Sequence, residues 1–305
     1  SKSYSRRYID SYFLRVAIAE FSFIGFHGLL MAKRVFCLVL LLFYFLIPLS
    51  SFAGLETVNA VLNRNQFQKS FQTYLAEANK GNLEAQNKVG EAYLNGIDAP
   101  KNGQKALRWF GLAAEKGSLD AQANLGYMYL FGEGVDQNYF KALDWNRKSA
   151  EAGNARAQYN LYHTYLNGFG VYQDRSEAVL WLTRAAQGGL AMAQAKLGIL
   201  FRTGINVQQN LTEAVKWLRL AAEQGNPDGQ YNLARHYATG LGVERDFIQS
   251  YVWYELADDS CPVGSNKSQC AEFRDSIARV LSPLELQQAE KLAATMKVKI
   301  ATGTP

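Results

Sequence analysis

Apolar and polar positions along most of the chain follow the spacing of amphipathic helices. In residues 117–152, Leu125 and Tyr129 lie four apart, which places them on one buried face of a helix over about 119–130. Gly132 follows, and glycine commonly ends a helix because it adopts left-handed backbone angles without strain. The segment therefore begins with one helix of about three turns.

A second helix is predicted in the same segment. Asn138 can accept hydrogen bonds from the free N–H groups of a first turn, so it is the expected N-cap. Ala142, Trp145 and Ala150 then form the buried face, and Gly153 ends the helix near residue 152. Such a helical hairpin cannot bury its apolar face alone, so it needs neighbours.

The hairpin recurs every 36 residues. All five tryptophans keep this step: Trp109, Trp145, Trp181, Trp217 and Trp253. So do the helix-ending glycines, the aromatic column and the N-caps: Gly96, Gly132, Gly168, Gly204, Gly240; Tyr93, Tyr129, Tyr165, Phe201, Tyr237; Asn102, Asn138, Asp174, Asn210, Asp246. Five units follow: 81–116, 117–152, 153–188, 189–224 and 225–260.

These columns predict an all-α superhelical solenoid of five helix–turn–helix repeats with helical caps. The alanine columns let helices approach closely, and tryptophan is expected to fill the space that remains. Truncating one such buried tryptophan to alanine costs about 3–5 kcal/mol. Glu177 after Asp174, and Glu213 after Asn210, predict reciprocal capping boxes.

The repeated pattern A-x-x-x-L-G-x-x-Y-x-x-G-x-G-V-x-x-[DN]-x-x-x-A-x-x-W-x-x-x-A-A-x-x-G resembles the Sel-1-like repeat, a relative of the tetratricopeptide repeat, over residues 81–260. Departures occur at Gly96-Ile97-Asp98-Ala99, at Tyr162 and Ala234, which stand where glycine follows leucine, and at Asn206 in the loop. The resemblance implies a scaffold that binds proteins or peptides and rarely catalyses.

Both ends of the repeats are expected to be capped by helices. Residues 54–80 supply an N-terminal capping helix, and 261–305 supply C-terminal capping helices over about 268–280 and 282–297. The second of these begins with an N-cap serine, proline at the first position and glutamate three after the cap, which are helix-start signals: Ser282, Pro283 and Glu285.

The residues before the repeats have the order of a secretory signal peptide. Lys33 and Arg34 precede an apolar run over 35–49, and Ser51-Phe52-Ala53 fits a signal-peptidase site. We expect 31–53 to be a signal peptide cleaved after Ala53; an uncleaved membrane anchor is the alternative. Residues 1–30 are expected to be an upstream extension of the reading frame. The mature protein is then periplasmic or secreted and has no membrane span.

Charge argues against nucleic-acid binding. The chain holds 32 Lys and Arg against 27 Asp and Glu, a net charge of +5. Residues 1–53 carry 6 basic and 2 acidic residues, so the remainder is only +1. No basic stripe runs along the repeats, so no nucleic-acid partner is expected.

Cysteine usage agrees with export. Cys261 and Cys270 lie in one short segment after the repeats, and in an oxidising compartment we expect them to form a disulfide. Free thiols are the alternative, and they become the favoured one in a cytosolic protein.

The resemblance places any ligand in a concave groove lined by the first helix of each unit. The predicted partner-binding residues are Tyr127, Tyr159, His163, Ile199, Arg202, Tyr231 and Arg235. Exposed tyrosine and arginine suit peptide recognition, since both are frequent interface hot spots. The alternative for each of them is simple packing between helices.

Catalytic and metal-binding signals are weak. The chain contains no G-x-S-x-G, H-E-x-x-H, P-loop or S-x-x-K sequence. A branch of the resembled family linked to penicillin binding and β-lactamase activity has a cysteine pair in each unit, and units one to four here have none. His163 and His236 stand two units apart, so no metal, cofactor or catalytic residue is expected.

Two functions remain at this stage. The first is a non-catalytic, monomeric, exported adaptor that binds a protein or peptide in the groove. The second is an envelope protein that binds or processes cell-wall ligands such as peptidoglycan or β-lactam-like compounds. The second needs convergent acids, for which Glu84 and Glu91 are the candidates.

Overall fold

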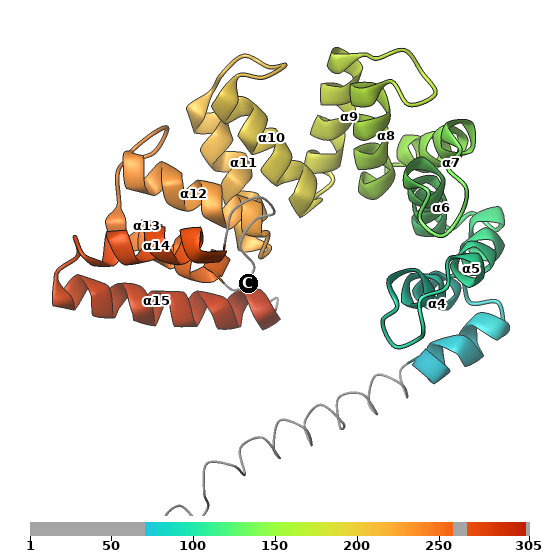
Figure 1. Cartoon of the computed structure of the whole chain (residues 1–305), viewed down its shortest axis with the longest axis horizontal. Coiled ribbons are helices and arrows are strands. Elements are labelled where there is room, and N and C mark those ends of the chain that lie inside the picture. Colours follow the sequence, from blue (N-terminus) through green and yellow to red (C-terminus); the bar gives the residue numbers. More distant parts are fainter. Residues whose placement is uncertain (1–70, 259–266, 303–305) are drawn as a thin grey trace, which may run out of the picture. The chain divides into compact units, whose positions relative to one another are not determined.

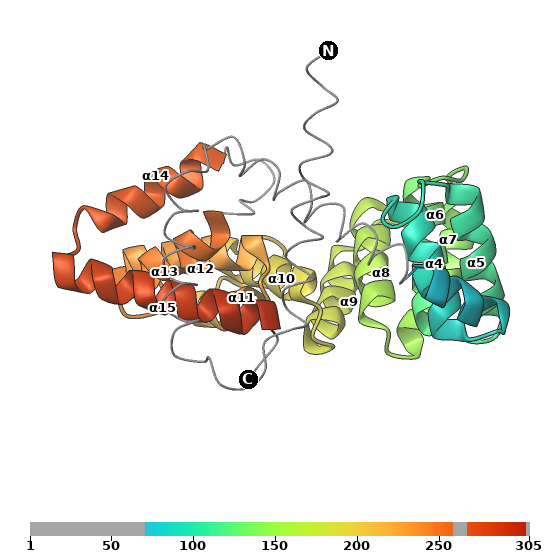
Figure 2. The same ribbon diagram turned by 90° about the horizontal axis from the view of Figure 1, so that it is seen from below.

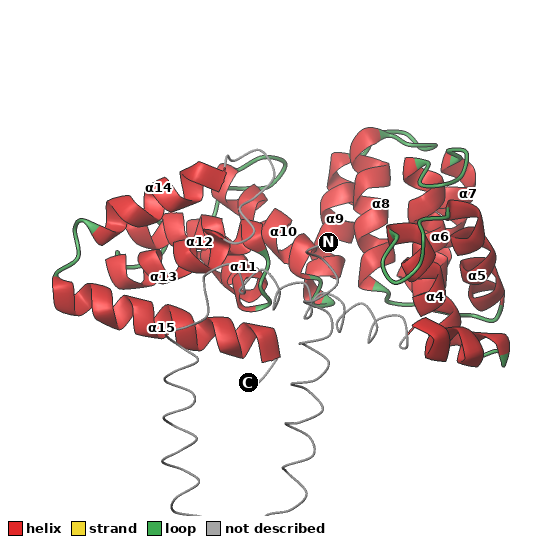
Figure 3. Cartoon of the chain, turned by 60° about the horizontal axis from the view of Figure 1, so that its bottom comes forward, coloured by secondary structure: helices red, strands yellow, loops and turns green. Residues whose placement is uncertain are grey.

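The computed structural model describes residues 71–258 and 267–302. This part of the chain consists of helices and loops without strands, which confirms the all-α prediction (Figures 1 and 3). Residues 1–30, the predicted signal peptide 31–53, Cys261 and most of the N-terminal capping segment lie outside the described residues. Residues 71–79 of that segment are helical.

Ten helices form the five units as successive pairs. Their bounds are α4 Leu83–Asn95, α5 Gly103–Glu115, α6 Leu119–Phe131, α7 Tyr139–Glu151, α8 Ala155–Asn167, α9 Arg175–Gln187, α10 Ala191–Thr203, α11 Leu211–Glu223, α12 Pro227–Thr239 and α13 Phe247–Asp258. Even-numbered helices are the first helices of the units, and odd-numbered helices are the second helices. Each helix packs mainly on the next one in the chain.

The predicted helix ends are present. The first helices end at a left-handed glycine in every unit, with φ between 71° and 73°: Gly96, Gly132, Gly168, Gly204 and Gly240. The asparagine N-caps are also confirmed; the side chain of Asn138, for example, accepts from the Lys141 N–H at 3.0 Å. The loop departures are accommodated as expected, because Asp98 and Asn206 take φ values of 65° and 61° where other units have glycine.

The capping boxes predicted in the repeats are wrong, because only one of the two expected hydrogen bonds forms. The Asp174 carboxylate does accept from the Glu177 N–H. The Asp174 N–H, however, donates to the backbone carbonyl of Tyr165 at 2.9 Å, which leaves it unavailable to the Glu177 side chain. The same bond links the aromatic and N-cap columns in all five units, so it fixes the loop between the two helices of each pair.

In units one, two and four, close approach between the two helices depends on a glycine in the first helix, whereas Tyr162 and Ala234 stand at this position in units three and five. A Cβ added at Gly90 would lie 2.5 Å from the Phe110 ring, and one at Gly198 would lie 2.7 Å from Leu218. The residue that fills this contact stands one position after the tryptophan, and it is buried in every unit: Phe110, Asn146, Leu182, Leu218 and Tyr254.

The tryptophans themselves are less buried than expected. Trp181 and Trp253 are buried, whereas Trp109, Trp145 and Trp217 are half-buried. The Arg184 guanidinium lies 4.5 Å from the Trp181 ring centroid, so a cation covers one ring face. The expected cost of a tryptophan truncation therefore applies to two of the five units.

A glutamine column joins each unit to the helix before it. Gln122 is buried, and its amide donates to the Ala114 carbonyl at 3.1 Å. The equivalent bond recurs in every unit, from Gln86, Gln158, Gln194 and Gln230. This link between units was not recognised in the sequence, although the glutamines also keep the 36-residue step.

Two further helices follow the last unit, as predicted. They are α14 Lys267–Ala278 and α15 Pro283–Thr302, the second of which extends five residues beyond its expected end (Figure 2). Its start is a true capping box, since the Ser282 N–H donates to Glu285 at 2.8 Å and the Glu285 N–H donates back to the Ser282 hydroxyl. Ala289 and Ala293 of α15 are buried in a cluster with residues of α13.

Two glycine-to-alanine substitutions are expected to change stability in opposite directions. Gly198→Ala forces a methyl group against Leu218 and the Ala214 carbonyl, and such overpacking destabilises by about 1–3 kcal/mol. Gly111, inside α5, has no atom within 4 Å of an added Cβ, so Gly111→Ala stabilises by about 0.5–1 kcal/mol. Urea midpoints of both variants test this, and equal signs would contradict the packing described.

Candidate interaction surface

In two places, the first helices of successive units approach one another directly. Helices α6 and α8 are in contact, and so are α10 and α12, whereas no two second helices among the described units pack together to the same extent. Side chains from different units can therefore meet on this side of the molecule. We call it the first-helix face, defined by the outward-pointing residues of α4, α6, α8, α10 and α12.

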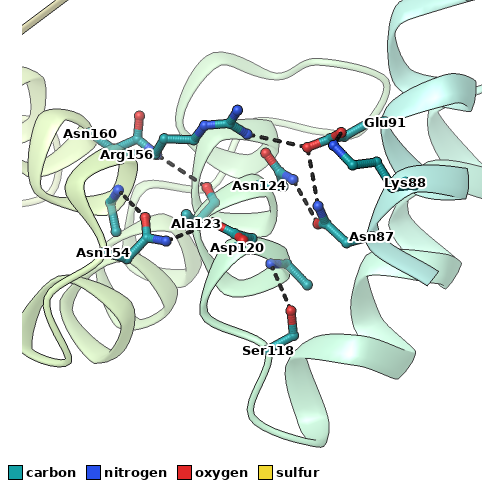
Figure 4. Close-up of polar contacts among 12 residues, drawn as sticks. Asn87, Lys88, Glu91, Ser118, Asp120, Ala123, Asn124, Asn154, Arg156 and Asn160 are labelled. Carbon is teal, nitrogen blue, oxygen red and sulfur yellow. Dashed lines mark hydrogen bonds and ion pairs between the residues drawn. The ribbon is translucent and has the colours of Figure 1, made fainter. Parts of the chain in front are cut away.

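Polar contacts connect units one, two and three on this face (Figure 4). The Asn124 amide donates to Asn87 at 2.9 Å, and the Asn87 amide donates to Glu91 at 3.1 Å. Arg156 reaches past α6 and donates to the same carboxylate at 3.2 Å. An ion pair between units one and three requires that the first helices converge.

Glu91 is consequently an ionised carboxylate whose charge is balanced by Lys88 and Arg156, and its role is structural. Burial raises its pKa, but the hydrogen bonds and charges of Lys88 and Arg156 outweigh burial and hold the pKa below its ordinary value. Glu84 is exposed in the first turn of α4, about 10 Å away along the helix axis. The two acids proposed for cell-wall chemistry therefore do not converge on one point.

An aromatic patch occupies the face at units two and three. It consists of Tyr127, Phe131, Tyr159 and His163. The Tyr127 and Phe131 rings lie 4.9 Å apart, Phe131 lies 6.0 Å from His163, and His163 lies 4.8 Å edge-on to Tyr159. Tyr127 and Phe131 are 38% and 42% exposed, so they present the accessible part of the patch.

Phe131 was missing from the sequence prediction. It follows Tyr127 by four residues, a spacing that places two side chains on the same side of a helix. Because Phe131 directly precedes the helix-ending Gly132, it was not counted among the residues of the helix face. Tyr159 and His163 are half-buried, and Tyr159 also stacks on the buried Tyr162 at 5.7 Å, so its exposure is smaller than predicted.

Units four and five hold the remaining predicted residues. Ile199 and Arg202 lie half-buried on α10, and Arg235 lies exposed on α12 with its guanidinium 5.9 Å from the Tyr231 ring. Tyr231 is less free than expected because it packs against Tyr254 of α13 and Phe273 of α14, at 5.8 and 6.2 Å. The C-terminal cap therefore covers part of this end.

Asp228 and Lys196 link the aromatic patch electrostatically to units four and five. Burial raises the pKa of the Tyr159 hydroxyl, and the negative charge of Asp228 on α12 raises it further. Burial also raises the pKa of Asp228, against the opposing effect of Lys196 on α10. Units three, four and five therefore influence one another electrostatically, as units one to three do through Glu91.

The two described histidines have different surroundings. His163 belongs to the aromatic patch, and burial followed by the charge of Lys196 lowers its pKa. His236 is only 2% exposed, and its Nδ1 contacts the Leu241 carbonyl. Burial lowers the His236 pKa; the Leu241 bond opposes this change, and Arg202 and Arg235 reinforce it.

Hollows are present at the N-terminal end of the described structure. One of about 570 Å³ is lined by residues 75–81 and by α5, including Arg108 and Trp109. Among the described residues, no group of three or more His, Cys, Asp or Glu is placed to hold a metal ion. None of the described helices is long and apolar enough to cross a membrane.

Cys270 is buried and disulfide-bonded. Its expected partner, Cys261, lies outside the described residues, so the pairing of these two cysteines stays a prediction.

This arrangement defines a class of all-α repeat proteins whose variable side chains are gathered on one helical face. The Sel1 repeat model matches five segments of the chain: 83–118, 119–154, 155–190, 191–226 and 227–257. Because these matches cover more than half of it, the chain belongs to the Sel1 repeat family. Proteins of this family are generally protein–protein interaction scaffolds.

Solved structures are similar to the chain. A Sel1 repeat protein from Oxalobacter formigenes is 34% identical, with a TM-score of 0.59, over 67% of this chain and 59% of that one. A protective antigen with an SLR fold from uropathogenic Escherichia coli is 30% identical, with a TM-score of 0.45, over 77% and 57%. The chain thus spans less than two thirds of either protein. No curated protein matches the sequence.

His236 is expected to make stability fall in mild acid. Its folded pKa lies below the ordinary 6.5, so the unfolded chain binds a proton before the folded chain does. The contribution is complete above pH ~6.5 and is lost as pH falls through the folded pKa. The urea midpoint should drop less between pH 7.5 and 5 in His236→Gln than in the parent. An unchanged drop would show that His236 is not the cause.

Proposed function

We propose that this protein is an exported, monomeric scaffold that binds a peptide segment of a protein partner along its first-helix face. The general role of Sel1 repeat proteins supports a protein partner. The observation that carries the proposal is the aromatic patch, in which Tyr127 and Phe131 remain substantially exposed above a packed layer of Tyr159 and His163. Aromatic side chains held rigidly by neighbours lose little entropy on binding.

The spread of the candidate residues over several units favours a peptide over a small molecule. The candidate residues lie on four first helices, α6, α8, α10 and α12, and side chains two units apart act on one another, as Asp228 does on Tyr159. The hollows at unit one are lined by other residues than those of the aromatic patch.

Export is the second component of the proposal. The signal-peptide pattern of residues 31–53 motivates it. The disulfide state of Cys270 supports it, because such bonds persist in oxidising compartments. The competing proposal, an envelope protein that acts on cell-wall ligands, loses its candidate acids because Glu91 is paired and Glu84 stands apart from it.

Mass spectrometry of the protein recovered from a bacterial host tests export. The expected product begins at Gly54 and appears in the periplasm or the medium. Recovery of a cytosolic product that retains residues 31–53 would contradict the export proposal without affecting the binding proposal.

The binding proposal predicts that the aromatic patch carries affinity. Peptides selected from a random library against the full chain should lose at least tenfold in affinity for the Tyr127→Ala/Phe131→Ala double variant, since aromatic hot spots contribute about 2 kcal/mol or more. Fluorescence anisotropy measures the dissociation constants.

The chain offers a matched control in Phe140→Ala/Tyr172→Ala. These two aromatic residues are 72% and 97% exposed and lie outside the first-helix face. This variant should bind like the parent. Equal losses in both double variants, or no loss in the first, would show that the selected peptides bind elsewhere.

A further inference from the structure

Two arginines at units four and five have no acidic partner. Arg202 lies on the last turn of α10, and Arg235 lies on α12. Neither forms an ion pair within the described part of the chain, whereas Lys88 and Arg156 at the other end of the face share Glu91. The first-helix face thus carries satisfied charges at one end and unsatisfied positive charges at the other.

Arg202 is held in an unfavourable position. Its Nε atom is buried and has no hydrogen-bond partner. Burial lowers the pKa of Arg202, the charge of Arg235 lowers it further, and Tyr231 acts in the opposite direction. A guanidinium remains charged at any ordinary pH, so the missing acceptor and the neighbouring like charge are a standing cost to the folded chain.

His236 is a second buried group without a full set of partners at this end. A carbonyl only accepts, so the His236 Nδ1 must carry the hydrogen that bonds to Leu241. The Nε2 atom is buried and has no partner. The charges of both Arg202 and Arg235 act on this ring, so two side chains with an unpartnered buried nitrogen, Arg202 and His236, lie near the exposed Arg235.

The chain itself supplies no carboxylate to them. Asp228, in the first turn of α12, acts on Tyr159 and is itself influenced by Lys196. Glu255 of α13 is paired with Arg274 at 3.1 Å. No acidic side chain is among the groups that influence Arg202 or His236. A carboxylate of a bound partner would therefore meet no competing acidic side chain of the described residues at the arginine pair.

We propose that Arg202 and Arg235, beside Tyr231, form the acidic-residue site of the first-helix face, and that the bound partner peptide carries carboxylates two to three units away from its apolar anchor. This inference rests on the proposed function. The planar guanidinium fork matches a carboxylate in paired hydrogen bonds. The aromatic patch receives the apolar residues of the peptide, and the arginine pair receives Asp or Glu at the other end.

A designed pair of peptides tests the site on the full chain. The first is a fluorescent decapeptide with two aromatic residues near one end and three glutamates near the other; the second has glutamine at the three acidic positions. The glutamate peptide should bind at least tenfold more tightly, and the advantage should shrink as salt rises, because partly exposed ion pairs are screened. Equal affinities would overturn the inference.

Variants then locate the effect. Arg202→Gln/Arg235→Gln should reduce binding of the glutamate peptide to the level of the glutamine peptide. Arg175→Gln/Arg279→Gln makes the same change in net charge at two exposed arginines off the face and should leave binding unchanged. Equal losses in both would show that only overall charge matters, which overturns the site.

Stability provides a separate readout. Arg202→Gln removes a charge that is repelled by Arg235, so it should raise the urea midpoint of the protein without ligand. A loss of peptide binding in this variant could then not be attributed to unfolding. Arg202→Lys keeps the charge but loses the planar fork, and it should bind with intermediate affinity. A lowered midpoint for Arg202→Gln would mean that Arg202 is a structural residue and would overturn the inference.

The two proposals fail separately. If selected peptides depend on Tyr127 and Phe131 but the glutamate and glutamine probes bind alike, the scaffold proposal stands and the acidic site falls. If the glutamate probe depends on Arg202 and Arg235 but not on Tyr127 and Phe131, the acidic site stands and the continuous peptide face falls. Direct binding of inorganic phosphate to the arginine pair, with no binding of the glutamate peptide, would overturn the carboxylate assignment in favour of a phosphate ligand.

Discussion

The structure depends on close contact between the two helices of each unit. A first-helix residue as small as Gly90 or Gly198 admits a bulky second-helix side chain, Phe110 or Leu218, into the space a Cβ would occupy. The loop is then fixed by the bond between the N-cap N–H and the aromatic-column carbonyl. Buried glutamines such as Gln122 join one unit to the previous helix. These contacts use one side of each first helix and leave the other side free to vary.

Within one repeat, some positions hold the fold together and others differ from unit to unit. The glutamine position is identical in all five units, whereas the position one residue later is buried in three units and half-buried in the two that carry tyrosine: Asn87, Ala123, Tyr159, Ala195 and Tyr231. The variation produces a polar network at units one to three, an aromatic patch at units two and three, and unpaired arginines at units four and five. A graded face of this kind can give a bound peptide a direction as well as an affinity.

Much of the fold could be predicted, because a fixed 36-residue step reports helix ends, N-caps and small contact residues together. The left-handed angle of Asn206 followed from the loop pattern alone. Side-chain burial could not be predicted as well. The 36-residue repeat identifies Trp145 as a constant position, but it does not show that the next residue, Asn146, is the buried one that packs against Gly126. The candidate site was found in outline, but the cover over Tyr231 comes from Phe273, which lies outside the repeats. Contacts between units, such as Glu91 with Arg156, depend on helix convergence that no local pattern contains.

Hydrogen–deuterium exchange of the full chain, with and without a saturating library-selected peptide, tests the central claim most directly. Binding on the first-helix face predicts slower exchange in α6, α8, α10 and α12, with α7, α9 and α11 nearly unchanged. Protection concentrated in the second helices, or confined to the hollows at unit one, would contradict the account, because the peptide would then bind on a side whose residues serve to hold the units together.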